Sequence, residues 1–370
     1  MTIQKQAGFW FAALAAALFF LWLFSGILLP FVAALALAYL LDPVADRLEK
    51  LGLGRLGATL LILLVFVLVL VLVLVLILPL VIRELTDFLA LLPDYVTRLQ
   101  ILLVERGAPL LDYFGVEISG PELQRNIGDI VSRGAGYLGT VLGTLLASGQ
   151  TVLSVFSLLV LTPIIAFYLL IDWDRMVAKV DGWLPLRYRP TIRRLAGEID
   201  DVLSRFVRGQ ATLCLILGSF YAVALTLIGL NFGALIGLVA GILSVIPYVG
   251  SITGLLLSVG VAIVQFWPDY VWVIAALAIF LFGQFVEGNF LSPKLLGGAV
   301  GIHPVWLMFA LFAFGSLFGF VGLLLAVPLA AMVGVLTRFA IQRYLESPFY
   351  DAGRSAAAKS IPNPTEDGDG

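Results

Sequence analysis

Long uncharged stretches dominate the hydrophobic pattern of this 370-residue chain. Asp, Glu, Lys and Arg are absent from six stretches, which are residues 6–41, 56–82, 134–171, 209–268, 270–286 and 295–337. Because an α-helix rises ~1.5 Å per residue, about 20 apolar residues cross a hydrocarbon core of ~30 Å. A strand would leave backbone groups unpaired in lipid. The pattern therefore predicts an all-α integral membrane protein with about eight transmembrane helices, some broken or re-entrant, plus amphipathic extramembrane helices.

The length of each stretch predicts the number of spans that it holds. Residues 56–82 fit one span, whereas residues 6–41 are too long for one helix and contain Ser25, Gly26 and Pro30 as a break. We expect two spans before Asp42, and six more at residues 56–82, 150–171, 209–229, 233–264, 270–290 and within 304–337. The two longest stretches could instead hide re-entrant hairpins.

Cationic side chains gather in three segments between the spans, which are residues 42–55, residues 172–208 and the C-terminal tail. Positive residues favour the cytoplasmic side, so these segments and both termini are expected there. The predicted organisation comprises transmembrane helices 1 to 3 (1–82), an extramembrane amphipathic helical region (83–148), transmembrane helix 4 (149–171), cytoplasmic amphipathic basic helices (172–208), a transmembrane region with broken helices (209–340) and a disordered cytoplasmic tail (341–370).

Two segments between the spans show helical spacing. In the first, Leu85, Phe88 and Leu92 recur at helical intervals, and Pro93 is expected to begin a helix. The second carries an apolar stripe made of Ile192, Leu195, Ile199, Val202 and Phe206. This stripe suits either a moving gate or a helix lying on anionic lipid, and the lipid surface is favoured.

Composition narrows the chemistry further. Charged residues make up 12% of the chain, against about 25% in soluble domains, which excludes a soluble enzyme or a nucleic-acid binder. Cys214 and His303 are the single cysteine and the single histidine, so neither an intrachain disulfide nor a cluster of such metal ligands can form. No Lys follows a Gly, so a Walker A loop is absent. We expect no enzyme activity, cofactor or bound metal.

Polar and helix-breaking residues concentrate in the second half of the chain. Broken helices expose carbonyls and dipole ends within the membrane, so these residues are candidates for a transport path. The candidate path residues are Pro247, Tyr248, Gly250, Gln284, Glu287, Asn289, Pro293, Lys294 and Pro328. Pro247 and Pro328 could also be simple kinks, and Glu287 could reach headgroup water. Gln210, Asn231 and Gln265 either line the path or bond across helices.

Small residues at helical spacing predict close helix packing. The glycines concerned are Gly233, Gly237, Gly241, Gly315 and Gly319. Packing within one chain is favoured over dimerisation.

Several blocks resemble the autoinducer-2 exporter family of bacterial transporters, the PerM-type permeases. The similarity covers about residues 10–345 and includes AYLLDPVADRLEK (Ala38–Lys50), TPIIAFYLLIDWDRM (Thr162–Met176), SVIPYVGSITG (Ser244–Gly254), EGNFLSPKLLGGAVGIHPVWLMFALFAFG (Glu287–Gly315) and GLLLAVPLAA (Gly322–Ala331). The resemblance implies an eight-span protein of the bacterial inner membrane and a homo-oligomer, with a pentamer as one form. It also implies a link either to export of the quorum-sensing molecule autoinducer-2 or to sodium–proton exchange.

Three functions follow from these observations. The first is a permease that moves a small polar solute by secondary or passive transport, with Gln284, Glu287 and Asn289 as contacts. The second is an antiporter of sodium or another monovalent cation against protons, with Glu287 as the titrating carboxylate. The third is a membrane scaffold or sensor that binds a partner through the 83–148 region.

Overall fold

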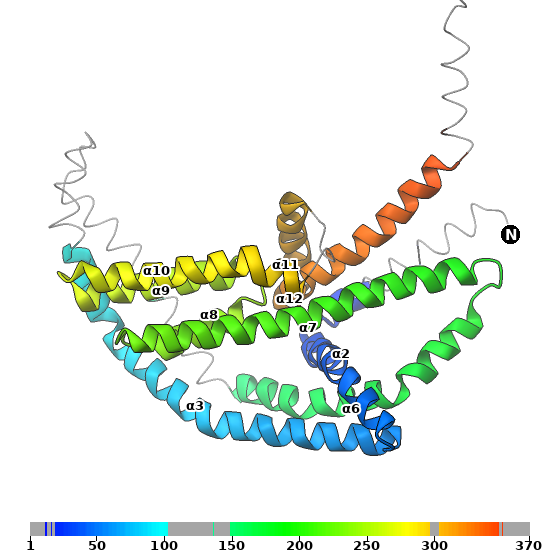
Figure 1. The fold of residues 1–370 in the computed structure, drawn as a ribbon, viewed down its shortest axis with the longest axis horizontal. Helices are drawn as coiled ribbons and strands as arrows, with labels where there is room; N and C mark the ends of the chain where they lie inside the picture. Colours follow the sequence, from blue (N-terminus) through cyan, green and yellow to red (C-terminus); the bar gives the residue numbers. More distant parts are fainter. Residues whose placement is uncertain are drawn as a thin grey trace, which may run out of the picture. The chain divides into compact units, whose positions relative to one another are not determined.

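The computed structural model describes residues 19–102, 149–296 and 303–347, together with Ala12, Ala16, Gly136 and Tyr350. The elements are η1 (Ser25–Ile27), α2 (Leu28–Lys50), α3 (Arg55–Leu102), α6 (Gly149–Trp183), α7 (Arg189–Leu227), α8 (Gly233–Leu243), α9 (Val249–Phe266), α10 (Tyr270–Val286), the π-helix η3 (Glu287–Leu291), α11 (Ser292–Leu295) and α12 (Pro304–Leu345) (Figure 1). The described part of the chain contains no strand, and seven of its helices are long and apolar enough to cross a membrane. The predicted all-α membrane fold is confirmed.

The chain forms two compact units. Unit 1 comprises residues 1–177 and 205–297, and unit 2 comprises residues 178–204 and 298–370. Most of the first predicted span, the region 103–148 apart from Gly136, and most of the tail lie outside the described residues.

Helix α3 is longer than its uncharged stretch. Its 48 residues extend about 72 Å, more than twice the thickness of a hydrocarbon core. Pro93 lies inside this helix, so the expectation that Pro93 begins a helix is wrong. The Thr97 hydroxyl donates to the Pro93 carbonyl at 2.8 Å, within the turn that follows the proline. The third span and the start of the 83–148 region therefore form one continuous helix.

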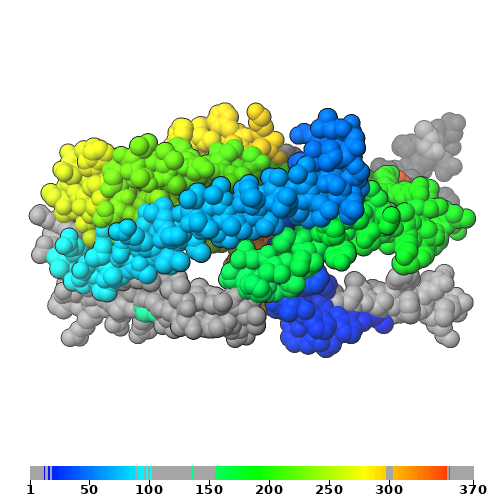
Figure 2. All heavy atoms as spheres, turned by 90° about the horizontal axis from the view of Figure 1, so that it is seen from below, coloured from blue at the N-terminus to red at the C-terminus, as the bar shows by residue number. Residues whose placement is uncertain are grey.

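In the first half of unit 1, α3 packs between other helices. Ala34 and Leu37 of α2, Leu63 of α3 and Ala166 of α6 form one buried cluster. Seen from below, α3 runs along this face of unit 1, from blue to cyan, with helices of the second half on one side and the green α6 on the other (Figure 2). Small alanines at the crossing points allow these helices to approach closely where no hydrophobic force acts between them.

The glycines of α8 lie against the backbone of α7. A Cβ on Gly237 would stand 2.1 Å from the Ala222 nitrogen, and a Cβ on Gly241 would stand 2.3 Å from the Gly218 Cα. A Cβ on Gly233 would stand 2.8 Å from the Leu225 carbonyl carbon. The stripe of three glycines therefore forms the contact between α7 and α8 within one chain.

Helices α8 and α9 form a hairpin instead of a single crossing near 233–264. The start of α8 lies beside Leu225, and the end of α9 returns to the same place, where the Gln265 side chain bonds the backbone of Gly229 and Asn231. The tip, at Ser244–Tyr248, lies instead beside Gln210 of α7. Since α8 has only 11 residues, it extends about 16 Å and cannot cross the membrane alone. The start of α8 and the end of α9 therefore lie at the same end of unit 1.

Helix α12 of unit 2 is also a hairpin. Its backbone is non-helical at Gly319, where φ is +59° and ψ is −136°. Gly322 lies against the Phe314 carbonyl, and an added Cβ at Gly315 would meet the Leu323 side chain, so the arms run back along each other. The helix is interrupted at Gly319. The expectation of a break at Pro328 is wrong, since Pro328 lies inside the continuous second arm. Gly319 has no atom within 4 Å of an added Cβ and serves the reversal, not a packing surface.

The apolar stripe at the start of α7 is covered by protein. Leu195, Ile199 and Val202 pack against Ala331 and Val335 of α12 within unit 2. The expectation that these residues lie on lipid is therefore wrong. The same amphipathic spacing serves both a lipid surface and a helix partner, so the pattern alone could not separate them.

Candidate functional site

One face of α7 carries a row of polar side chains in an otherwise apolar helix. Gln210, Cys214 and Tyr221 follow one another at spacings of four and seven residues, which places them on the same face. Gln210 and Tyr221 are buried, and Cys214 is half-buried. The amide of Gln210 lies 3.8 Å from the Cys214 sulfur.

Helix α10 and the π-helix η3 that follows it each present one polar side chain toward this row. The Gln284 side-chain amide donates to the Glu287 carboxylate at 2.8 Å, and both residues are half-buried. Glu287 lies close enough to act electrostatically on the Cys214 thiol and the Tyr221 hydroxyl. These five side chains, Gln210, Cys214, Tyr221, Gln284 and Glu287, are called the polar cluster below.

The backbone changes its winding at Glu287. Residues Glu287–Leu291 form the π-helix η3, which follows α10 directly. A π-turn rotates the following side chains relative to an α-helix, and such turns are frequent at functional sites. The acidic residue of the polar cluster thus stands at the first residue of an irregular turn.

Among the described residues, no hydrogen bond of ordinary geometry reaches the Tyr221 hydroxyl, although the residue is 1% exposed and the Gln284 side chain lies beside it. Its ring stacks on Phe280 with centroids 4.2 Å apart, and its hydroxyl lies next to Gly283 and the Gln284 side chain. A buried hydroxyl without a partner costs about 1–3 kcal/mol. A water molecule or a solute hydroxyl would remove that cost.

The tip of the α8–α9 hairpin closes one end of the polar cluster. The Gln210 amide donates to the Ser244 carbonyl at 2.7 Å, and the Ser244 hydroxyl donates to the Ala240 carbonyl at 2.7 Å. Pro247 lies in the tip, and Tyr248 has a left-handed φ of +69° and an exposed side chain. An added Cβ on Gly250 would meet Ser244, so the glycine lets α9 begin directly beside the end of α8.

Other predicted path residues lie away from the polar cluster. The Asn289 amide donates to the Phe285 carbonyl of its own helix, and Asn289, Pro293 and Lys294 are exposed. No ion pair joins Glu287 to Lys294 within the described part of the chain. Pro328 is buried in unit 2.

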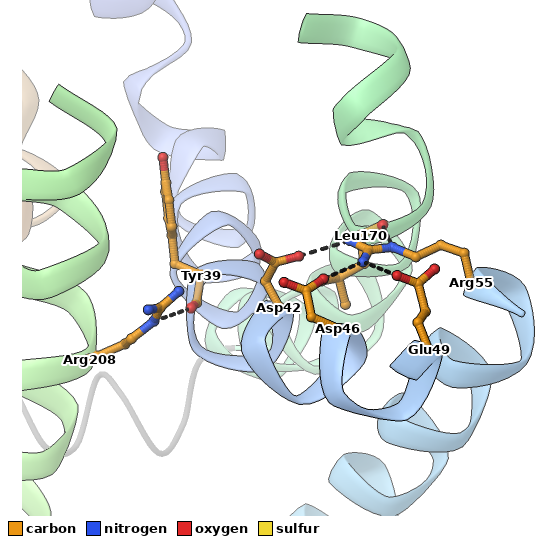
Figure 3. A network of polar contacts seen from close by, with 7 residues as sticks. All are labelled: Tyr39, Asp42, Asp46, Glu49, Arg55, Leu170 and Arg208. Carbon is orange, nitrogen blue, oxygen red and sulfur yellow. Dashed lines mark hydrogen bonds and ion pairs between the residues drawn. The ribbon is translucent and has the colours of Figure 1, made fainter. Parts of the chain in front are cut away.

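A second group of polar contacts joins four helices at the end of α2 (Figure 3). Arg55 of α3 pairs with three carboxylates of α2, those of Asp42 at 2.8 Å, Asp46 at 2.9 Å and Glu49 at 3.3 Å. The Arg55 Nε also donates to the Leu170 carbonyl of α6 at 2.9 Å. This arginine therefore fixes α2, α3 and α6 at one end of unit 1.

Helix α7 joins the same end through a proline. Pro43 lies inside α2 and has no N–H, so the Tyr39 carbonyl four residues earlier lacks its helical donor. The Arg208 Nε donates to this carbonyl at 2.9 Å (Figure 3). Segments 42–55 and 205–208 therefore lie at the same end, as the charge pattern predicts.

The opposite end is held by different contacts. The Glu84 carboxylate of α3 accepts from the Leu235 amide in the first turn of α8 at 3.1 Å, and the Asn231 amide donates to the Tyr95 hydroxyl at 3.1 Å. Asn231 and Gln265 thus bond across helices at this end, while Gln210 belongs to the polar cluster. Sequence reasoning missed Tyr221 and Cys214, although their helical spacing from Gln210 was visible.

Comparison with known proteins agrees with this architecture. The profile of the family described as AI-2E family transporter matches residues 11–341. The chain is 31% identical over 318 residues to PerM of Escherichia coli strain K12, whose name describes a permease, covering 84% of this chain and 86% of PerM. It is 29% identical over 317 residues to YrrI of Bacillus subtilis strain 168, named for transport, with 84% and 85% covered. It is 26% identical over 315 residues to the AI-2 transport protein TqsA of Escherichia coli, with 84% and 85% covered. The chain is a multi-pass membrane protein and belongs to the AI-2E family of transporters.

Proposed function

We propose that this permease carries a small polar solute past the polar cluster, and that autoinducer-2 is the first solute to test. The support is a set of mixed donors and acceptors on α7, α10 and η3, buried or half-buried in a region that is otherwise apolar. Both the neutral amide of Gln284 and the carboxylate of Glu287 can bond solute hydroxyls. The relative TqsA is named for AI-2 transport, which suggests the solute.

The observation that carries the proposal is the buried Tyr221 hydroxyl, which has no hydrogen bond of ordinary geometry among the described residues. Buried polar groups in folded proteins almost always have a well-formed partner, so such a hydroxyl beside Gln284 and Glu287 suggests a contact for a polar solute. The half-buried Glu287 gives the cluster partial access to the surroundings.

Flux through proteoliposomes tests this proposal. Tyr221→Phe and Glu287→Gln are expected to lower uptake of labelled autoinducer-2 at least tenfold, because each removes a contact from the cluster. The matched control is Thr226→Val, since Thr226 also lies on α7 but is exposed and bonds only the Ala222 carbonyl of its own helix. Equal flux in all four proteins would refute the role of the cluster.

Exchange of a monovalent cation for protons is the second candidate, favoured by one observation. The Glu287 carboxylate accepts a hydrogen bond from a neutral amide, and no cationic side chain pairs with it among the described residues. An ionisable group in such surroundings is a candidate ion carrier. Sodium-driven proton movement in vesicles, lost in Glu287→Gln, would favour exchange over solute flux.

The setting of the permease is also proposed. We place it in the bacterial inner membrane, with the Arg55 end of unit 1 and both chain termini in the cytoplasm, because cationic segments favour that side. Lys50→Cys and Asp94→Cys, each in a Cys214→Ser background, are expected to react with an impermeant thiol reagent from opposite sides. A homo-oligomer, with the pentamer as one form, stays a proposal that mass measurement in detergent would test.

A further inference from the structure

A cavity of about 520 Å³ lies between the two arms of the α12 hairpin in unit 2. Its walls combine aromatic side chains of the first arm, Trp306 and Phe309, with small residues, among them Ala313 and Gly334. The volume falls within the range of about 300–1,000 Å³ that is usual for small-molecule sites. The arms meet closely near Gly322 and Phe314, and the cavity lies between them on the other side of that contact, toward His303 and Arg338.

The polar groups of the cavity gather at its mouth. His303, immediately before the first arm, and Arg338, on the second arm, are the titratable side chains among the described residues that line it, and no carboxylate occurs among them. The His303 Nδ1 accepts from the Val305 amide at 3.3 Å, so the neutral ring carries its proton on Nε2, which can donate. The first arm also begins at the mouth, where a helix N-terminus favours an anion.

The mouth coincides with the edge of the apolar sequence. The uncharged stretch 295–337 ends immediately before Arg338, so this arginine stands where the second arm leaves the hydrocarbon. Apart from Arg338, the residues that line the cavity belong to the uncharged stretch. An occupant must therefore be anionic at the membrane surface and apolar over about 16 Å below it, the rise of the 11 residues that follow His303 up to Phe314.

We propose that this hairpin cavity binds one acyl chain of an anionic phospholipid from the surrounding bilayer, with the phosphate at Arg338, His303 and the start of α12. Charge complementarity selects this occupant over a zwitterionic lipid, and the apolar walls select a chain over a free phosphate ion. This inference is independent of the proposed solute and of the polar cluster, because its residues all belong to unit 2.

Native mass spectrometry of the full chain in detergent tests the site, with phosphatidylglycerol and phosphatidylcholine as probes. Arg338→Gln is expected to weaken phosphatidylglycerol binding about fivefold, the equivalent of about 1 kcal/mol for one basic residue at the membrane surface. It should leave phosphatidylcholine binding unchanged. Arg343→Gln is the matched control, because Arg343 lies on the same arm, pairs with Glu346 at 3.6 Å and does not line the cavity.

A second variant tests the apolar part. Ala313→Leu fills the cavity and is expected to remove one retained lipid. In a separate measurement, phosphatidylglycerol with brominated chains should quench the tryptophan fluorescence of the wild-type protein more than that of Trp306→Phe. Equal loss in both arginine variants, or no lipid preference, would overturn the proposal. Unchanged lipid retention in Ala313→Leu would also overturn it, and would show that another part of the chain or a second copy covers the cavity.

Discussion

The two helical hairpins of this permease are built from similar residues, but their small residues pack in opposite ways. In the α8–α9 hairpin, glycines at every fourth position press α8 against the backbone of α7, and Gln210 satisfies the carbonyl at the tip. In the α12 hairpin, the arms touch near Gly322 and enclose a cavity of about 520 Å³ farther along. Small residues therefore close a helix contact only when another backbone faces them. Without that backbone they line a space.

The largest expected effect comes from adding one methyl group to a glycine of each hairpin. Gly237→Ala places a Cβ 2.1 Å from the Ala222 nitrogen, so α7 and α8 must separate, and we expect a loss of about 3 kcal/mol or more. Gly334→Ala meets no atom within 4 Å and should be neutral or stabilising by up to about 1 kcal/mol. Thermal unfolding in detergent measures both. Similar melting temperatures for the two variants would contradict the contrast.

The tip of the α8–α9 hairpin gives the next effect. Gln210→Leu leaves the buried Ser244 carbonyl without the side-chain donor it now has, which is expected to cost about 1–3 kcal/mol. Thr212→Val serves as the control, because Thr212 is exposed and bonds only the Arg208 carbonyl within its own helix. Hydrogen exchange at residues 240–250 should rise in the first variant alone. Protection that stays the same would show that Gln210 does not hold the tip.

The reversal of α12 should give a smaller loss. Gly319→Ala meets no neighbouring atom, so its cost comes from the backbone alone, with φ at +59°, and is expected to be about 1–2 kcal/mol. Gly26→Ala is the control, because Gly26 also faces open space but has no positive φ. Melting temperatures of the purified variants decide the question. A Gly319→Ala protein as stable as the control would mean that α12 does not reverse there.

The smallest effect concerns the turn before the α7 segment that packs on α12. Arg189 and Arg193 both donate to Asp181, which lies ten residues past the uncharged stretch, and they hold the pKa of Asp181 well below its usual value. The stabilisation is therefore complete above the ordinary pKa near 4 and is lost as the pH falls through the lowered folded value. Limited proteolysis of residues 184–188 should not change between pH 8 and pH 5.

Asp181→Asn makes the same turn susceptible at every pH in that range. Arg194→Gln is the control, since Arg194 pairs only loosely with Glu198 at 3.8 Å. Increased cleavage of the wild-type protein between pH 8 and pH 5 would contradict the sign of this prediction.

Much of the fold was predictable because lipid imposes length and polarity on each helix. Residues 56–82 could be nothing but a helix, and Ser25 and Gly26 do form a break before α2. The hairpins could be offered only as an alternative, because residues 209–268 suit either two crossings or a crossing followed by a hairpin. The contacts that decide, Gly237 on Ala222 and Gln210 on Ser244, join residues that are far apart in the sequence.

The site was predictable only where polarity interrupts an apolar run. Gln284 and Glu287 stood out for that reason and lie together, whereas Asn289 and Lys294, two and seven residues after Glu287, are exposed within and after the π-helix. Tyr221 resembled any aromatic residue of a membrane helix. Its significance comes from its burial beside Gln284 without a hydrogen bond of ordinary geometry among the described residues, which a sequence does not display.

Because Pro43 has no N–H, the Tyr39 carbonyl of α2 accepts a hydrogen bond from Arg208 of α7. Alanine at this position would supply the missing amide to α2, and that amide would compete with the Arg208 guanidinium for the Tyr39 oxygen. An unbroken hydrogen-bonding pattern in α2 would thus weaken the contact between α2 and α7. At Pro43, a regular hydrogen-bonding pattern within α2 and a strong contact between α2 and α7 therefore oppose each other.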